Sequence, residues 1–566
     1  MNRLLLPLCL MLCVSESRSQ TVGLMMNAPD AFDGYTLVAP TGATRTHLID
    51  NCGRIINQWD SEFRPGESAY LLEDGSLLRT ARQPSTVFNG GGIGGRIERF
   101  SWEGELLWSY TLANDTAHHH HDMAWLPNGN VVLMAWELKT AEEAAAAGRE
   151  GGGPLWPPML VEIEPTGAEG GNVVWEWHAW DHMIQNVDST LPHYAGPANS
   201  PTRFNVNFGQ VTGGGFPGGN AGGDWFHCNA LAYNAALDHL MLNSRNWNEF
   251  YIIDHGTTSE EAAGPAGDLL YRWGNPQTYN RGDAEDRLLF QQHDAHWLLG
   301  EGPSMTGGDP AFTALIFNNG NGRPGGDGSS VDELVLPWDD EAEPSTYTLP
   351  PDDDFTAPFA PWGLDWTWPE NPTMGFHSHN ISGAQRLPNG NTLICEGNKG
   401  ELFEITADGD IVWKYITAYN QWGAISQGDD PFGNATFRAY RYAPDFAAFD
   451  GKDMTPGDPV EGNPLPFDCT LYPAPVDTTG TTGIETSDVE LRFGPNPADH
   501  TLFIRTSTPS SVRMTDLSGR TIHFPNEQQV QHDIDVSGWP SGVLLLQLLN
   551  ANGLPIGSPQ RLHIRH

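Results

Sequence analysis

The chain has 566 residues, which is enough for a large hydrophobic core and more than one domain. It carries 29 Lys and Arg against 71 Asp and Glu, and the formal net charge of −42 argues against nucleic acid and anionic membranes as partners, because phosphate repulsion is long-ranged. Its 64 Gly, 43 Pro and 20 Trp are typical of many short strands joined by tight turns, so we expect an all-β protein.

The first 20 residues have the pattern of a secretory signal peptide. Arg3 precedes an apolar run over residues 4–14, and polar residues follow up to Gln20. This order is typical of a signal for export, and the run is too short to span a bilayer. No later segment has about 18 apolar residues in a row, so we expect a soluble mature protein whose main domain covers residues 21–476.

The main domain repeats one pattern six times. A glycine turn is followed by two apolar residues and then by an aromatic residue six positions after the glycine. The copies begin at Gly53, Gly104, Gly171, Gly267 and Gly409, with a shortened copy at Gly363. Asn-Gly or Asp-Gly hairpin turns introduce further apolar strands at residues 127–133, 388–394 and 74–78. Repeated hairpins with aromatic landmarks predict a six-bladed β-propeller, and a sandwich of irregular hairpins is the competing fold. Only residues 141–149 are expected to form a helix, within a loop.

Four cysteines remain after removal of the signal: Cys52, Cys228, Cys395 and Cys469. In an oxidising compartment they can form up to two disulfides, in three connectivities. Cys52 and Cys469 flank the main domain, so we predict a bridge that ties its ends together. Free buried thiols are the alternative.

One histidine precedes the inner strand of four different repeats, beside or near an Asp or Asn. These are His121, His227, His293 and His379. In a propeller the inner strands begin at the mouth of the central channel, so these side chains are expected to converge. Imidazole acts as nucleophile, base or metal ligand near neutral pH. A structural role repeated in every blade is the alternative. In the run of residues 118–121, strand neighbours point to opposite faces, so at most two of the four can enter one site.

Several longer motifs resemble the bacterial arylsulfate sulfotransferases over roughly residues 34–470. The carriers include Asp224-Trp-Phe-His-Cys-Asn-Ala-Leu-Ala-Tyr-Asn234, Gln292-His-Asp-Ala295, Phe317-Asn-Asn-Gly320 and the segment from Ile381 to Gly397. The resemblance implies a six-bladed propeller that transfers a sulfuryl group from a small phenolic sulfate ester to a phenolic acceptor. It also implies a ping-pong reaction through a sulfated histidine, without a nucleotide sulfate donor and without cofactor or metal.

The resemblance also implies roles for individual residues. His293 matches the histidine that becomes sulfated. His227, Asn229 and Arg245 would hold the sulfuryl oxygens, and His121 would protonate the leaving phenolate and deprotonate the acceptor. His379 and Asn380, at the fourth histidine position, are expected to contact substrate.

The C-terminal region is expected to be a separate domain. Residues 477–486 are a Thr/Gly-rich linker, and residues 487–566 contain short alternating runs that predict a small Ig-like β-sandwich. Phe493-Gly-Pro-Asn-Pro-Ala498, Met514-Thr-Asp-Leu-Ser-Gly-Arg520 and Trp539-Pro-Ser-Gly-Val543 resemble a type IX secretion sorting domain. This implies delivery through the periplasm to the cell surface or the medium by the type IX machinery, and removal of the domain.

Two other functions stay open on the residues alone. One is a non-catalytic propeller that binds a ligand or glycan at the channel mouth. The other is a metal-dependent hydrolase that uses the histidine cluster. The run of residues 90–95 has the glycine spacing of a dinucleotide site, but a strand follows it where a helix is required, so we interpret it as a glycine-rich loop.

Overall fold

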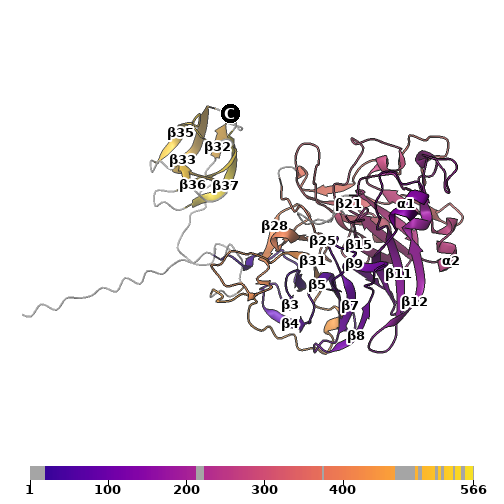
Figure 1. Cartoon of the computed structure of the whole chain (residues 1–566). Helices are drawn as coiled ribbons and strands as arrows, with labels where there is room; N and C mark the ends of the chain where they lie inside the picture. Colours follow the sequence, from indigo (N-terminus) through magenta and orange to yellow (C-terminus); the bar gives the residue numbers. More distant parts are fainter. Residues whose placement is uncertain are drawn as a thin grey trace, which may run out of the picture. The chain divides into compact units, whose positions relative to one another are not determined.

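The computed structural model describes residues 20–211, 222–372, 375–465, 469, 491–494, 500–516, 521–523, 528–539, 542–549 and 555–564. The chain divides into two compact units, Met1–Pro475 and Val476–His566, and each is described by itself (Figure 1). The predicted linker at residues 477–486 and all but the last residue of the predicted signal peptide lie outside the described residues.

The regular secondary structure of the first unit consists almost entirely of strands, most of them in antiparallel groups of four (Figure 1). Three groups are β5(Pro65–Leu71)–β6(Leu77–Arg82)–β7(Gly95–Phe100)–β8(Leu106–Thr111), β9(Ala117–Trp125)–β10(Val131–Glu137)–β11(Pro158–Pro165)–β12(Gly171–His178), and β15(Cys228–Asn234)–β16(His239–Ser244)–β17(Glu249–Asp254)–β18(Tyr271–Trp273). Three more are β19(His293–Trp297)–β20(Thr313–Asn318)–β21(Ser330–Val335)–β24(Trp366–Trp368), β25(Gly383–Arg386)–β26(Thr392–Glu396)–β27(Glu401–Ile405)–β28(Ile411–Ile416), and β31(Thr436–Tyr442)–β2(Tyr35–Pro40)–β3(Arg45–Ile49)–β4(Ile55–Asp60). An all-β architecture is therefore confirmed.

The first strands of these groups contact one another in a closed series, β5, β9, β15, β19, β25, β31 and again β5. One parallel pairing, between Glu67 and His121, joins the β5 and β9 groups into a single eight-stranded sheet. The first strands therefore surround a common centre, and residues that begin them are brought together.

The outermost strands carry the repeat found in the sequence. β4, β8, β12, β18, β24 and β28 are each the fourth strand of their group, and each contains the aromatic residue of one copy; β28 is followed in its sheet by β1. Indole N–H groups on these strands donate to backbone carbonyls in the next group at 2.7 to 2.9 Å, which explains the signature residue in the copies at Gly53, Gly171 and Gly267. In the copies at Gly104 and Gly409 the donor is the tryptophan two residues before the signature tyrosine. The pairs are Trp59 to Ser101, Trp108 to Gly170, Trp177 to Gly267, Trp273 to Pro361 and Trp413 to Asn51.

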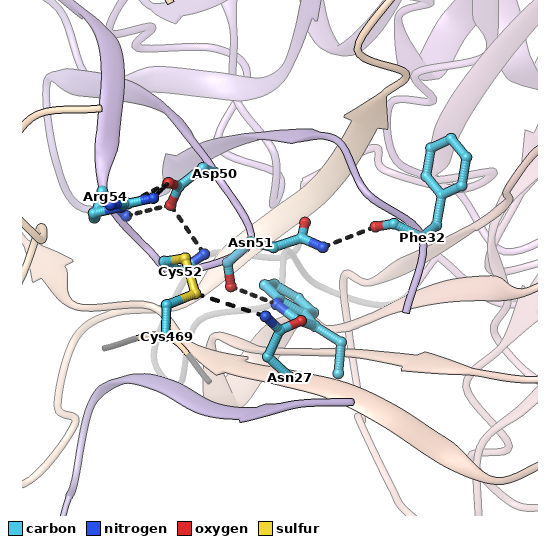
Figure 2. Close-up of a disulfide and its surroundings, with 8 residues drawn as sticks. Asn27, Phe32, Asp50, Asn51, Cys52, Arg54 and Cys469 are labelled. Carbon is cyan, nitrogen blue, oxygen red and sulfur yellow. Dashed lines mark hydrogen bonds and ion pairs between the residues drawn. A yellow bond between two sulfur atoms is a disulfide. The ribbon is translucent and has the colours of Figure 1, made fainter. Parts of the chain in front are cut away.

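The two ends of the first unit meet in shared sheets. β2, from the N-terminal end, pairs with β31, and β1(Gly23–Asn27) pairs with β28. The predicted disulfide between Cys52 and Cys469 is confirmed, and it links residues 417 positions apart (Figure 2). Asp50 supports the turn at Cys52, since its Oδ1 accepts the Cys52 N–H at 2.9 Å. Cys228 and Cys395 are buried free thiols.

Short elements occupy the long connections. The predicted helix is confirmed as α1(Ala141–Ala146), which begins with a capping box between Thr140 and Glu143. The others are α2(Ser259–Ala262), β13(Met183–Ile184), β14(Phe204–Asn205), β22(Trp338–Asp339), β23(Thr346–Tyr347), β29(Tyr419–Asn420) and β30(Gly423–Ala424). Among the residues that the structure describes, no helix has the length and hydropathy needed to cross a membrane.

The second unit is a smaller strand assembly. Its strands are β32(Leu491–Gly494), β33(Thr501–Asp516), β34(Thr521–His523), β35(Gln529–Asp535), β36(Gly542–Leu549) and β37(Pro555–Ile564). The first part of β33 pairs with β32 and β35, and its last part pairs with β34 and β36. Leu502, Ile504, Val512, Met514 and Leu546 are buried in one cluster, so this unit has a core of its own.

Candidate functional site

The four predicted histidines line one cavity of about 520 Å³, together with Arg245 and Asn380. His121 lies in β9, His227 precedes β15, His293 begins β19 and His379 lies shortly before β25. The convergence expected from the repeat positions is therefore present. The volume is in the range of small-molecule sites.

The backbone at this mouth is unusual for non-glycine residues. His121 and His227 have φ of 53° and 49°, and Asp294, next to His293, has φ of 56°. Left-handed backbone in such residues costs about 1 to 2 kcal/mol. The same conformation therefore recurs at or beside three of the cavity histidines.

The hydrogen bonds of His293 define its tautomer. Its Nδ1 lies 2.7 Å from Oδ1 of Asn319, whose amide nitrogen donates to the carbonyls of Ser378 and Ile381. Since that amide is fixed by its other bonds, Nδ1 of His293 carries the proton and Nε2 carries the lone pair. Burial, and next the positive charge of Arg245, hold the pKa of His293 well below its usual value. The imidazole is therefore neutral, as a nucleophile must be.

A carboxylate supports His227. Its Nδ1 lies 2.6 Å from Oδ2 of the buried Asp224, so Nδ1 donates and Nε2 is left free. The rings of His227 and His121 meet edge to face, with centroids 4.9 Å apart. Burial, and next His227, hold the pKa of His121 well below its usual value.

Arg245 is the cation that is free to meet an anion. Its guanidinium contacts only neutral groups, with Gln291 Oε1 at 2.6 Å and Asn246 Oδ1 at 3.1 Å. No described carboxylate lies within ion-pairing distance of it. Arg82 also lines the cavity, but it is paired with Glu67 at 3.0 Å. Asp224, which also lines the cavity, acts on Arg245 only from beyond ion-pairing distance. Arg245 is therefore the described cavity cation that an anionic group can meet without breaking an ion pair.

Glu67 was not predicted from the sequence. It is buried at the cavity with φ of 120°, and burial is the main reason that its pKa is raised. Neither a motif nor a repeat position marks it. Asp224 was within reach of prediction, because it stands three residues before His227 in the motif that carries the family resemblance.

The glycine-rich loop at residues 90–95 contributes Gly90, Gly91 and Gly92 to the cavity wall. Gly92 has φ of +71°, and a Cβ there would overlap the imidazole of His121. The glycines therefore let the backbone approach the histidines closely, a use of this loop that its spacing did not indicate.

Asn229 does not line the cavity. Its amide nitrogen donates to the Gln292 carbonyl at 3.0 Å, and its oxygen accepts from Asn243 at 2.5 Å. Alternation along a strand places Asn229 on the same face as His227, but the register shifts between Cys228 and Ala230. Its fully buried side chain therefore bonds to the segment that leads into His293.

Beneath the histidines lies a buried cation shared by two carboxylates. Arg438 Nη1 is 2.8 Å from Asp122 Oδ2, and its Nε is 3.0 Å from Asp294 Oδ1. These aspartates directly follow His121 and His293. Burial would lower the pKa of Arg438, but Asp122 and Asp294 outweigh it and hold that pKa above its usual value.

His118, His119 and His120 are buried beside this site, but they do not line the cavity. Of the four histidines in the run of residues 118–121, His121 lines the cavity. This agrees with the expectation that at most two of them can enter one site. Across the described ranges, no group of three or more His, Cys, Asp and Glu side chains has the arrangement of a metal site.

Comparisons with known proteins identify both parts of the chain. The sequence profile of the arylsulfotransferase (ASST) family matches residues 24–331, and that of a secretion system C-terminal sorting domain matches residues 493–556. The sorting domain means that the protein is secreted to the cell surface or beyond it. No curated protein matches the chain.

Solved structures match only distantly. A protein of unknown function from Bacteroides caccae is 12% identical with a TM-score of 0.37, over 72% of this chain and 98% of that one. A streptogramin B lyase is 10% identical with a TM-score of 0.32, over 72% and 86%. A putative 6-phosphogluconolactonase from Bacteroides fragilis is 11% identical with a TM-score of 0.32, over 73% and 99%.

Proposed function

Because the chain belongs to the arylsulfotransferase family, we propose that it transfers a sulfuryl group from a phenolic sulfate ester to a phenolic acceptor through a sulfated His293. The observation that carries this proposal is the neutral, Asn319-oriented imidazole of His293 in the same cavity as Arg245. A nucleophile beside a cation that is not held in an ion pair is the combination that attack on an anionic ester requires.

The fold that we propose for this site is a six-bladed β-propeller over residues 21–476, preceded by a signal peptide at 1–20. The closed series of first strands and the indole bonds between successive groups support it. The cavity would then occupy the mouth of the central channel. We also propose that residues 487–566 form an Ig-like sandwich after a linker at 477–486.

The reaction would proceed in two balanced steps. In the first, Nε2 of His293 attacks sulfur, the N–S bond forms, the S–O bond to the aryl group breaks, and the phenolate leaves with the electron pair. In the second, the acceptor phenol oxygen attacks sulfur, loses its proton, and the N–S bond returns its electrons to Nε2. Arg245 would hold the sulfuryl oxygens in both steps, since its planar fork matches an oxyanion group.

The acid and base role suits His227 better than His121. Asp224 at 2.6 Å would stabilise an imidazolium on His227. In that charged form, with a proton on Nε2 as well, His227 would protonate the departing phenolate and then take back a proton from the acceptor. His121, with its lowered pKa, stays neutral and would donate a hydrogen bond to a sulfuryl oxygen. His379 is exposed at the rim, where it and Asn380 would contact the aryl group. Asn229 would act indirectly, through the segment before His293.

The experiment that tests the proposal measures nitrophenolate release from 4-nitrophenyl sulfate, with and without phenol. We expect release that requires phenol and is lost in His293→Ala, whereas His193→Ala, an exposed histidine outside the cavity wall, should behave as wild type. Release by His293→Ala at the wild-type rate would refute the role of His293. No release by the folded wild-type protein with several phenols would favour the non-catalytic binding propeller.

A further inference from the structure

Two large aromatic side chains stand in solvent beside each other. Trp422 is 69% exposed and Phe432 is 71% exposed, and their rings stack with centroids 6.1 Å apart and an interplanar angle of 18°. Aromatic side chains of this size normally bury most of their surface. A contiguous exposed pair therefore indicates a binding surface rather than an isolated exposed residue.

This aromatic pair lies at the rim of the catalytic cavity. Ala435 and Thr41 line the cavity, and the Thr41 N–H donates to the Ala435 carbonyl at 2.8 Å. Ala435 is three residues from Phe432, which limits their Cα separation to about 11 Å. The indole of Trp422 reaches within 3.3 Å of the point where a Cβ on Gly433, two residues from Ala435, would lie.

A second set of contacts ties the same loop to another part of the rim. Gln421, next to Trp422, accepts a hydrogen bond from Arg64 at 3.0 Å. The Arg64 carbonyl in turn accepts the N–H of Arg82, a cavity residue, at 2.9 Å. The loop is also braced internally, since Asn420 donates to the Phe432 carbonyl at 2.8 Å and accepts the Trp422 N–H at 2.9 Å. The pair is therefore held in place at the rim.

The cavity wall itself lacks what an aryl group needs. Its described lining consists of imidazole, charged, amide and small or aliphatic groups, and among the described residues it includes no Phe, Tyr or Trp. An aryl substrate whose oxygen is at His293 thus meets a polar wall there. Phe437, whose ring centroid lies 6.0 Å from that of His121, is fully buried, whereas the Trp422–Phe432 pair is exposed.

We propose that Trp422 and Phe432 form an aromatic subsite for the distal ring of two-ring or larger phenols, a proposal that rests on the sulfuryl transfer proposed above. A single-ring phenol held at His293 fits inside the cavity and leaves the pair in water. A second ring, attached on the side away from the phenolic oxygen, extends over the rim and stacks on it. The preferred acceptors are therefore extended aromatic phenols rather than simple ones.

The test compares 4-phenylphenol with phenol as acceptor, with 4-nitrophenyl sulfate as donor. We expect wild-type kcat/KM to be higher for 4-phenylphenol than for phenol. In each single variant, Trp422→Ala and Phe432→Ala, the ratio of the two kcat/KM values should fall by about 2- to 12-fold, which corresponds to the loss of one aromatic pair. Trp362→Ala is the matched control, because Trp362 is 76% exposed and lines a different cavity. It should keep the wild-type preference.

An unchanged preference in both aromatic variants would overturn the subsite. So would a wild-type dimer that dissociates in Trp422→Ala, measured by light scattering, because a second copy of the chain would then be the occupant. If the wild-type protein does not use phenol as an acceptor, the proposed sulfuryl transfer is refuted, but the subsite can still be tested. In that case equilibrium dialysis measures the binding of 4-phenylphenol, and equal binding by wild type and Trp422→Ala would overturn the subsite.

Discussion

Replacing Arg438 by Met should damage both the stability of the first unit and its catalytic site. The guanidinium is 4% exposed and pairs with two buried carboxylates. The Met variant leaves Asp122 without a counter-charge, and leaves Asp294 with only the more distant His296, at 3.7 Å. Removing one partner of a buried ion pair costs about 3 to 5 kcal/mol. Because two carboxylates lose this partner, we expect the upper end, about 5 kcal/mol.

Urea unfolding measures this loss. With a slope of about 3 kcal/mol per molar, a loss of about 5 kcal/mol lowers the midpoint by about 1.7 M. Because the two aspartates follow His121 and His293, kcat/KM for nitrophenolate release should fall as well. The triple variant Asp122→Asn/Asp294→Asn/Arg438→Met removes all three charges and should recover much of the stability.

The matched control is Arg272→Met, which breaks a buried pair with Glu249 that touches no cavity residue. It should lower stability and leave kcat/KM of the folded protein at the wild-type value. A midpoint for Arg438→Met within about 0.3 M of wild type would refute the energetic reasoning. A large loss of stability with full kcat/KM would refute the idea that Arg438 positions the histidines.

Four further predictions concern the cavity, two buried histidines and the chain closure. Gly92→Ala should lower kcat/KM more than tenfold by displacing His121, whereas Gly129→Ala, with a similar positive φ and open space around it, should show only the backbone cost. The lowered pKa of His293 keeps the nucleophile neutral, so the acid limb of the rate profile, measured under conditions where the protein is folded, should lie well below pH 6.5. Burial lowers the pKa values of His47 and His119 to about 3 in the folded protein. Below pH 6.5 the unfolded chain therefore binds more protons than the folded one, and the thermal midpoint should fall as the pH drops. Cys52→Ser should lower the free energy of unfolding by up to about 5 kcal/mol, read from urea unfolding with and without reductant.

The sequence was most informative where a pattern is local and repeated. The glycine at Gly53 and the aromatic residue six positions later mark an outer strand, because a tight turn and an indole that bonds to the neighbouring group recur with that strand. The histidines could be placed for the same reason, since each stands at one repeat position. Predicted this way, four residues from distant segments proved to share a cavity.

What escaped prediction depends on contacts between groups rather than on local pattern. Neither Glu67 nor Arg438 belongs to a motif or to a repeated position. Their roles become visible only from their ion pairs with residues elsewhere in the chain. Trp422 and Phe432 are ten residues apart and meet only because their loop folds back on itself. Asn229 shows a different case: the family resemblance indicated a pocket residue, but the strand register shifts by one residue beside Asn229, and its side chain does not line the cavity.

The pairing of β2 with β31 has a consequence for biogenesis. Ribosomal synthesis delivers Tyr35–Pro40 long before its partner Thr436–Tyr442, so roughly 400 residues must be made before the last sheet can close. Contacts of such long sequence separation form slowly. A fold whose final pairing waits for its C-terminal strand, and whose disulfide waits for an oxidising compartment, is therefore completed late.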